Sequence, residues 1–321
     1  MSSDTLHPEL REIFRKPPPL PLHNGLGRAA IRLMMRLIPA DKPLPGVTLE
    51  DHRLDTCRVR VYRPESGATG AGLLWIHGGG YLIGNLAMND YDCSLFARKM
   101  GMVVVSVDYR LSPRHRFPAP LDDCNAAWHW LVREAPKLGV DTGRLVISGE
   151  SAGGGLAAAL VQRVHDAGGV QPAAQALFCP MLDDRTAANR ALDAENHLLW
   201  NNRLNRTGWT CYLGREPGAA DLPPYAAAAR RKDLAGLPPT WMGVGDIDLF
   251  LEENRLYAER LRAAGVECQF TVVPGAPHGF ECIARNAQVS IDYFENCFAF
   301  LRRALDQQTQ APPRASKISE G

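Results

Sequence analysis

Metal-binding and disulfide patterns are missing from this sequence of 321 residues. It contains no CxxC pair and no cluster of cysteine with histidine, so no segment has the spacing of a zinc site. The eight cysteines are scattered and mostly lie in apolar runs, which is typical of reduced core residues in an intracellular protein. We therefore expect no bound metal and a cytoplasmic location.

Long apolar runs and a strong net charge are missing as well. No run approaches the roughly 18 residues that a helix needs to cross a bilayer. The first residues, MSSDTLHPELREIF, lack the basic start and apolar centre of a secretory signal. A formal net charge of +1 creates no field that would attract nucleic acid. These absences predict a protein with no stable membrane anchor and no nucleic-acid partner.

The glycine-rich stretches lack the residue orders that hold phosphate groups. The chain has no G-x-x-x-x-G-K-[ST] loop, and the stretch HGGGYLIG does not follow the order G-x-G-x-x-G. A nucleotide-binding protein is therefore disfavoured, and we expect no cofactor.

The chain does contain a regular alternation of short apolar strands with helices. The stretch TCRVRVYRP alternates apolar and polar side chains, as a strand with one buried face does. Apolar strands are predicted at 72–76, 102–107, 145–148, 176–179, 240–244 and 269–273, and helices near 88–99, 121–135, 152–166, 251–264 and 288–305. This pattern predicts an α/β fold with a mostly parallel central sheet and helices on both faces.

Two segments, 1–45 and 186–225, do not share this alternation. The first contains GRAAIRLMMRLIPA, which has the period of an amphipathic helix with three arginines spaced four residues apart on one face. The second contains a helical stretch followed by a part rich in proline and alanine, as an insertion would. The polar composition of residues 306–321 predicts a disordered tail.

The stretch GESAGG follows a predicted strand and opens a predicted helix. This is the strand–turn–helix setting that the nucleophile elbow G-x-S-x-G requires. The turn leaves no room for a β-carbon at Gly149 or Gly153, and it lifts the hydroxyl of Ser151 above the sheet. Ser151 is therefore the candidate nucleophile.

A serine hydroxyl needs a base, and a histidine base needs an acid that orients it. His278 is the one histidine in a loop directly after a late strand, in PGAPHGF, where the partners of an elbow serine must lie. The acid precedes the histidine in chain order in this arrangement. Asp246 and Asp248 both lie in the loop GDIDLF, and spacing alone does not choose between them.

The stretch HGGGYLIGN follows the apolar strand GLLWI and brings bare backbone to the same edge of the sheet. Backbone N–H groups aimed at the oxyanion of a tetrahedral intermediate are worth about 3–4 kcal/mol each. We expect these donors to be Gly78, Gly79 and Ala152, the residue after the serine. The ring of His77 is expected to hold the loop by hydrogen bonds rather than to react.

These motifs together resemble the hormone-sensitive-lipase-like family of α/β-hydrolases, the carboxylesterase group marked by an HGGG loop. The resemblance runs from about residue 45 to 305 and includes HGGGYLIGN, DYRLSPRHRFPAPLDD, GESAGG, GLPPTWMGVGDIDLFLEE and VPGAPHGF. It implies an α/β-hydrolase catalytic domain made of 46–185 and 226–305. It also implies a helical cap made of 1–45 and 186–225.

The family pattern also assigns individual residues. Its acid belongs to a G-x-x-D step that matches Gly245 and Asp248, so the resemblance selects Asp248 over Asp246. Glu150 departs from the pattern, because an aspartate is commoner beside the nucleophile. Arg110, in DYRLSP, is expected to be an ion-pair partner within the protein rather than a substrate clamp.

The expected function is that of a serine carboxylesterase acting on short- to medium-chain acyl esters. Ser151 attacks, His278 carries the proton and Asp248 orients His278, while Tyr81 and Leu82 line the substrate pocket. An amidase or a lactonase using the same groups is the alternative. A small-molecule receptor on the same scaffold is disfavoured because the histidine is retained. The partner is a small-molecule ester, and the sequence leaves open whether the chain forms a homodimer.

The amphipathic stretch near residues 28–38 has two readings. Its apolar face can cover a pocket as part of the cap, with Arg28, Arg32 and Arg36 in water, or the helix can lie on an anionic membrane. The first reading fits the family architecture and is the one we expect.

Overall fold

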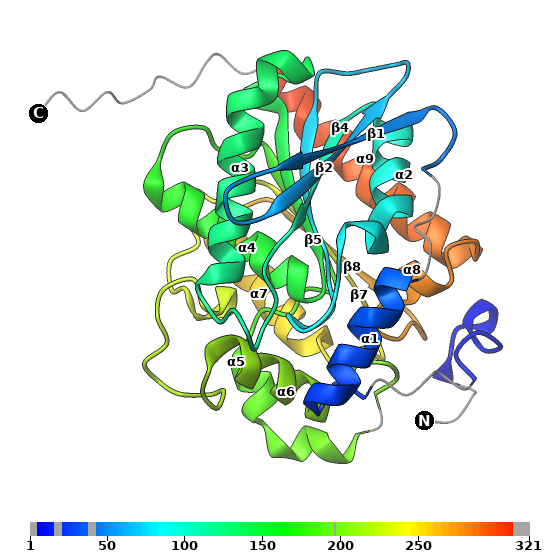
Figure 1. The fold of residues 1–321 in the computed structure, drawn as a ribbon, viewed down its shortest axis with the longest axis vertical. Helices are drawn as coiled ribbons and strands as arrows, with labels where there is room; N and C mark the ends of the chain where they lie inside the picture. Colours follow the sequence, from blue (N-terminus) through cyan, green and yellow to red (C-terminus); the bar gives the residue numbers. More distant parts are fainter. Residues whose placement is uncertain (1–4, 16–20, 38–42, 196, 311–321) are drawn as a thin grey trace, which may run out of the picture.

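The computed structural model describes residues 5–15, 21–37, 43–195 and 197–310. One eight-stranded sheet runs through its centre in the order β1-β2-β4-β3-β5-β6-β7-β8 (Figure 1). The first two pairings are antiparallel and the other five are parallel, so the predicted α/β architecture is confirmed. The strands are β1 (Val47–Arg53), β2 (Arg58–Pro64), β3 (Gly72–Ile76), β4 (Val103–Asp108), β5 (Leu145–Glu150), β6 (Ala174–Phe178), β7 (Thr240–Gly245) and β8 (Cys268–Val273).

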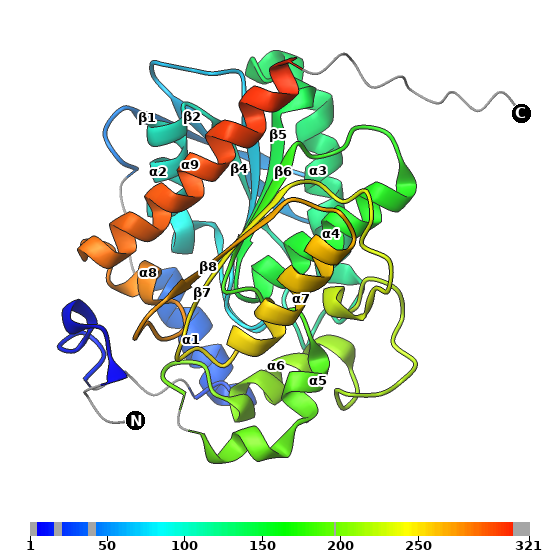
Figure 2. The same ribbon diagram turned by 180° about the vertical axis from the view of Figure 1, so that it is seen from behind.

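Helices cover both faces of the sheet because its central strands are buried on both sides. In β3, Leu74 and Ile76 point to one face, and Leu73 and Trp75 to the other, as the two-residue period of a strand requires. On the first face lie α3 (Ala119–Leu138), α4 (Ala152–Ala167) and α7 (Leu251–Ala263). On the second lie α2 (Asp90–Met100) and α9 (Gln288–Gln310) (Figures 1 and 2).

Shorter elements connect these layers. The α-helices are α1 (Gly25–Leu37), α5 (Asp184–Ala188), α6 (Asn202–Leu213) and α8 (Phe280–Ile283). The 3-10 helices are η2 (Pro8–Leu10), η3 (Leu86–Asn89), η4 (Thr142–Arg144), η5 (Arg190–Ala194) and η6 (Ala228–Arg230). One boundary differs from the sequence prediction: α9 continues to Gln310, so the segment predicted as a disordered tail from residue 306 begins inside a helix. Residues 311–321 lie outside the described part.

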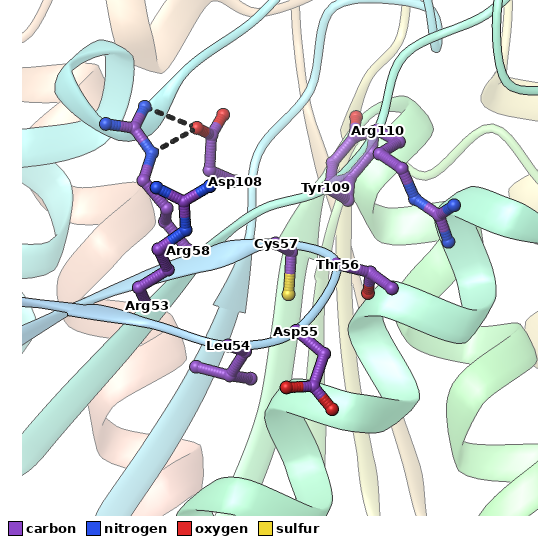
Figure 3. A pocket seen from close by; sticks show the side chains of 9 residues that line it. All are labelled: Arg53, Leu54, Asp55, Thr56, Cys57, Arg58, Asp108, Tyr109 and Arg110. Carbon is purple, nitrogen blue, oxygen red and sulfur yellow. Dashed lines mark hydrogen bonds and ion pairs between the residues drawn. The ribbon is translucent and has the colours of Figure 1, made fainter.

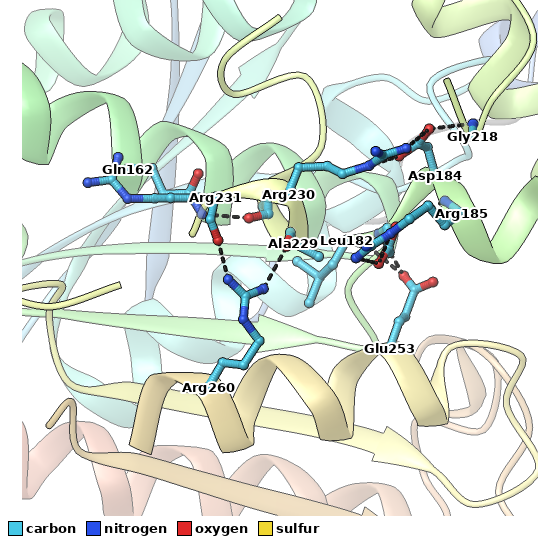
Figure 4. Close-up of polar contacts among 12 residues, drawn as sticks. Gln162, Leu182, Asp184, Arg185, Gly218, Ala229, Arg230, Arg231, Glu253 and Arg260 are labelled. Carbon is cyan, nitrogen blue, oxygen red and sulfur yellow. Dashed lines mark hydrogen bonds and ion pairs between the residues drawn. The ribbon is translucent and has the colours of Figure 1, made fainter. Parts of the chain in front are cut away.

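A buried ion pair joins the two ends of the segment 186–225. Asp184, just before the segment, is fully buried and accepts from Arg230, just after it, over 2.8 Å between Oδ1 and Nε. The same carboxylate accepts from the backbone N–H of Gly218 inside the segment (Figure 4). Glu253 of α7 accepts from the N–H of Leu182 over 2.7 Å. The base of the segment is therefore tied to the core near both of its ends.

The orientation of α1 differs from the one expected: Ile31 of the apolar face packs against the core, but most of that face turns outward. Arg32 turns toward the protein and donates to the carbonyl oxygens of Leu82 and Ser112, 2.8 and 2.6 Å away. The apolar side chains of Leu26 and Leu37 are 86% and 72% exposed. Periodicity separates the two faces of a helix but does not say which face turns inward, and here carbonyl acceptors hold the arginine face. The side chain of Arg36 lies outside the described part.

The eight cysteines are free thiols, and six of them are buried, which agrees with the prediction of reduced core residues. Among the helices in the described ranges, none combines the length and the apolar character needed to cross a membrane.

Candidate active site

The stretch GESAGG forms a sharp turn between β5 and α4. Ser151 sits between them with φ 53° and ψ −119°, a backbone conformation that few residues other than glycine adopt. A β-carbon on Gly149 would lie 2.4 Å from the carbonyl oxygen of Gly153, and one on Gly153 would lie 2.1 Å from that of Ile76. The tight turn that the sequence predicts is therefore present, and both glycines are needed for it.

Two loops bring a histidine and an aspartate to this turn from the ends of β8 and β7. The Nε2 atom of His278 lies 2.9 Å from Oγ of Ser151, and its Nδ1 atom lies 2.8 Å from Oδ2 of Asp248. All three residues are buried, with exposed fractions of 4%, 7% and 4% for Ser151, His278 and Asp248. The other carboxylate oxygen of Asp248 accepts from the N–H of Phe250 over 2.9 Å, which fixes the direction of the carboxylate.

The second candidate acid, Asp246, points elsewhere. Its Oδ1 atom accepts from the N–H of Gly275 over 2.6 Å, and its own N–H donates to the carbonyl oxygen of Val273. Asp246 thus braces the loop that carries His278, whereas Asp248 contacts the ring itself.

The surroundings of His278 have opposing effects on its pKa. Burial alone lowers the pKa, because it disfavours the charged imidazolium. The attraction and hydrogen bond of Asp248, together with the nearby charges of Glu150 and Glu281, outweigh burial and raise the pKa above its usual value of 6.5. The site therefore stabilises the protonated ring that a base forms when it accepts a proton.

The loop after β3 lies directly against the turn of Ser151. A β-carbon on Gly78 would be 3.3 Å from that of Ser151, so the backbone approaches the serine closely only because no side chain intervenes. In the described part of the chain, the backbone N–H groups of Gly78, Gly79 and Ala152 have no hydrogen-bond acceptor. The turn of Ser151 and the loop against it thus carry free N–H donors.

His77 shapes this loop, as the sequence predicts. Its Nδ1 atom lies 2.9 Å from the carbonyl oxygen of Gly78, and its ring stacks on Tyr109 with centroids 4.2 Å apart. The hydroxyl of Tyr109 donates to the carbonyl oxygen of His77 over 2.9 Å. Burial lowers the pKa of His77, which favours the neutral ring.

Glu150, the departure from the family pattern, extends away from the serine. Its Oε2 atom accepts from Nδ2 of Asn89 over 3.3 Å, and the same amide nitrogen donates to Asp92 over 3.0 Å. Glu281 is also buried nearby, and burial together with the charge of Glu150 raises the pKa of Glu281. The longer side chain of Glu150 thus joins a buried group of carboxyls behind the turn.

Two groups of side chains in the described ranges come close enough to share a metal ion, although the sequence shows no such cluster. Each group contains a thiol and has its ligand atoms within 4.8 Å of one another: Cys179 with Asp248 and His278, and Cys282 with Glu150 and Glu281. Burial raises the pKa of both thiols well above the usual value, which keeps them protonated. Metals bind thiolates, so neither group fits a metal ion well.

Aromatic rings that the sequence did not single out enclose the histidine. Phe250 packs edge-on against His278 with centroids 5.1 Å apart, and Trp200 lies 6.4 Å from it. The ring of Trp200 also fills the space beside Gly80, where a β-carbon would be 2.1 Å from its Cη2 atom. Trp200 comes from the segment 186–225, which interrupts the strand–helix alternation, so no local pattern could have assigned it.

Tyr81 and Leu82, expected at the substrate pocket, are both buried. Tyr81 stacks on Tyr212 with centroids 4.0 Å apart and meets the edge of Trp209 at 5.5 Å. These contacts join the loop after β3 to α6. A role for either residue in binding substrate stays a prediction.

A separate groove of about 440 Å³ lies at the ends of β1 and β4 (Figure 3). Its lining includes Tyr109 but none of Ser151, His278 and Asp248. Arg110 at this groove makes two hydrogen bonds of 2.8 and 2.9 Å to the fully buried carboxylate of Asp123. Arg110 is thus the ion-pair partner that the sequence predicts.

A serine on a strand–turn–helix elbow, with a histidine and an aspartate from later strands of a mostly parallel sheet, defines the α/β-hydrolase class. A family model described as the alpha/beta hydrolase fold matches residues 73–282.

Comparison with known proteins identifies the family within this class. The chain is 30% identical to the carboxylesterase NlhH of Mycobacterium tuberculosis over 289 residues, which cover 88% of this chain and 90% of that one. It is 33% identical to the ethyl acetate hydrolase of Pseudomonas putida over 250 residues, 75% of this chain and 77% of the other. The solved structure of a bacterial heroin esterase matches with a TM-score of 0.87 and 34% identity, covering 95% and 99% of the two chains. The chain belongs to the hormone-sensitive-lipase-like family of α/β-hydrolases, and it is a carboxylic ester hydrolase.

Proposed function

We propose that this enzyme is a serine esterase that cleaves short- to medium-chain acyl esters through an acyl-enzyme on Ser151. The observation that carries the proposal is the position of His278, which bridges Oγ of Ser151 at 2.9 Å and Oδ2 of Asp248 at 2.8 Å. Nucleophile, base and orienting acid are within hydrogen-bond reach of one another without any rearrangement.

In the first half of the reaction, Nε2 of His278 takes the proton of Ser151 as Oγ attacks the ester carbonyl carbon. The negative oxygen of the tetrahedral intermediate accepts from the N–H groups of Gly78, Gly79 and Ala152, each worth about 3–4 kcal/mol. The carbon–oxygen bond to the alcohol then breaks, and His278 gives its proton to the leaving alkoxide.

In the second half, His278 takes a proton from water, and the resulting hydroxide attacks the acyl group on Ser151. The second intermediate is stabilised by the same donors. Its collapse releases the carboxylic acid and returns the proton to Ser151. Asp248 holds the ring in place in both halves of the reaction and stabilises its charged form.

The acyl length is argued from the enclosure of the site and from the relatives. Trp200 and Phe250 stand against His278, so bulky rings border the site on that side. One relative is named for the hydrolysis of ethyl acetate, an ester with a two-carbon acyl group. Both observations favour small acyl groups.

A panel of p-nitrophenyl esters from acetate to laurate tests this proposal. We expect the highest kcat/KM for the short and medium chains and a steep fall toward laurate. An aliphatic lactone and a p-nitroanilide of the preferred acid belong in the panel, because the amidase and lactonase alternatives use the same groups. Faster cleavage of the lactone or the anilide, or a preference for laurate, would contradict the proposal.

The dependence of the rate on pH gives a second test. Only the neutral form of His278 can accept the serine proton, and its pKa is raised above 6.5. The value of kcat/KM should therefore fall as the pH is lowered, with a midpoint above that of an ordinary histidine. Initial rates on p-nitrophenyl acetate between about pH 5 and pH 9 measure this midpoint. A midpoint below 6.5, or no loss of rate on the acid side, would argue against His278 as the base.

A further inference from the structure

The outward face of α1 is apolar at the positions whose side chains the structure describes. Each residue of α1 that is described as exposed is apolar or glycine, and the large side chains Leu26, Leu33, Met34 and Leu37 are 86%, 57%, 52% and 72% exposed. Among the described residues, nine large hydrophobic side chains are exposed, and four of them lie on this one helix. Exposed apolar side chains gathered in one place mark interaction sites.

The rotation of α1 is fixed by its other face. Arg32 donates to the carbonyl oxygens of Leu82 and Ser112, and Arg28 donates to that of Leu22 over 2.8 Å. Turning the leucines inward would break these bonds, because it would move the guanidinium groups away from the carbonyl oxygens and into solvent. The helix, which lies on the surface of the fold (Figure 1), therefore presents its apolar face outward as a stable feature.

A groove of about 440 Å³ that is lined by arginine side chains lies beside this face. Its walls come from α1 and from the segment after β4, and the residues that line it are Gly25, Arg28, Ala29, Arg32, Pro113, Arg114 and Arg116. The lining thus contains four arginines and no carboxylate. Arg114 and Arg116 are exposed, and within the described ranges neither forms an ion pair.

We propose that the apolar face of α1 and the arginine groove together form a docking surface for membranes that contain anionic phospholipid. An interfacial helix buries its apolar face at the boundary between headgroups and acyl chains, and basic residues beside it attract anionic lipids. Leu26, Leu33, Met34 and Leu37 supply the apolar contact. The guanidinium groups of Arg114 and Arg116 bind phosphate oxygens, which they match in geometry.

Charge argues against a second copy of the chain as the occupant. A symmetric dimer through α1 would place the arginine groove of one copy near that of the other, and like charges brought together oppose association. An anionic membrane offers both the apolar layer and the opposite charge. The docking surface does not include Ser151, His278 or Asp248. An experiment that contradicts membrane docking would therefore not contradict the proposed esterase function, and the reverse also holds.

Flotation with lipid vesicles tests the proposal. Vesicles of phosphatidylcholine with about one quarter phosphatidylglycerol are compared with vesicles of phosphatidylcholine alone, at low and at high salt. We expect the full-length enzyme to float with the anionic vesicles and to be released by salt. The double variant Leu33→Glu/Leu37→Glu should bind at least tenfold more weakly, and so should Arg114→Glu/Arg116→Glu. Leu256→Glu on α7, where the leucine is 45% exposed, is the matched control and should bind as the wild type does.

Two further measurements, of esterase activity and of oligomeric state, control for misfolding and for dimerisation. Every variant should hydrolyse p-nitrophenyl acetate at the wild-type rate in the absence of lipid, which shows that it is folded. Should the glutamate pair fail this control, Leu33→Ala/Leu37→Ala replaces it. Wild-type binding by the α1 variants, or no binding by the wild type, would overturn the proposal. So would a wild-type dimer that only the α1 variants dissociate in size-exclusion chromatography with light scattering, because α1 would then be a subunit interface.

Discussion

Replacing Ser151 with alanine is expected to lower kcat for p-nitrophenyl acetate by about 10⁴- to 10⁶-fold and to leave the fold intact. The loss is this large because the substitution removes the atom that forms the acyl-enzyme, and the remaining donors act only on water attack. The melting temperature should stay close to that of the wild type, since the backbone of the turn is held by Gly149 and Gly153 and not by the hydroxyl.

Ser148 provides the matched control, because it is a buried serine on β5, the strand that leads to Ser151. Its hydroxyl donates to the carbonyl oxygen of Ala176 over 2.7 Å and makes no contact with a group in the proposed mechanism. Ser148→Ala should lose about 1 kcal/mol of stability and keep its rate. An organophosphate should label the wild type at Ser151 with a stoichiometry of about one and should not label Ser151→Ala. A Ser151→Ala enzyme that turned over at more than a few per cent of the wild-type rate would refute the assignment of the nucleophile.

The second large effect is expected when Asp248, the acid that orients His278, is replaced. Asp248→Asn should lower kcat by about 10⁴-fold, because an amide in place of the carboxylate favours the wrong tautomer of His278 and no longer stabilises its charged form. Asp246→Asn should have a far smaller effect on the rate, because the amide oxygen can still accept from the N–H of Gly275. Both variants keep the size of the side chain, so the comparison isolates the charge.

The two rates should be measured on the same ester at a pH where the wild type is fully active. The reverse order of effects would assign the acid role to Asp246, and equal small effects would remove both from the mechanism. A fall in the melting temperature of Asp246→Asn without a fall in rate would fit its contact with the loop of His278.

Several features follow from the sequence because they depend on local constraints. Gly149 and Gly153 mark the elbow, because a β-carbon at either position would lie only 2.4 or 2.1 Å from a neighbouring carbonyl oxygen. The apolar strands are recognisable because a strand covered on both faces is mostly apolar and does not alternate with polar residues. His278 could be selected because parallel strands bring the loops after their carboxyl ends to one edge of the sheet.

Other features depend on contacts between distant segments, which local sequence patterns do not show. Asp246 and Asp248 are two residues apart in one loop, and spacing alone does not show which of them is the acid that orients His278. Family resemblance favoured Asp248, and the folded loop directs its Oδ2 atom to the ring of His278. Trp200 reaches the same ring from the segment 186–225, which has no periodic signal of its place.

The rotation of α1 is the clearest example of a feature that the sequence could not predict. The sequence alone determined that this helix has an apolar face and an arginine face, because both follow from the helical period. It could not determine which face turns inward, because that depends on what the rest of the chain offers. Here Leu82 and Ser112, 50 and 80 positions from Arg32, offer carbonyl oxygens, and the arginine face turned inward to bind them.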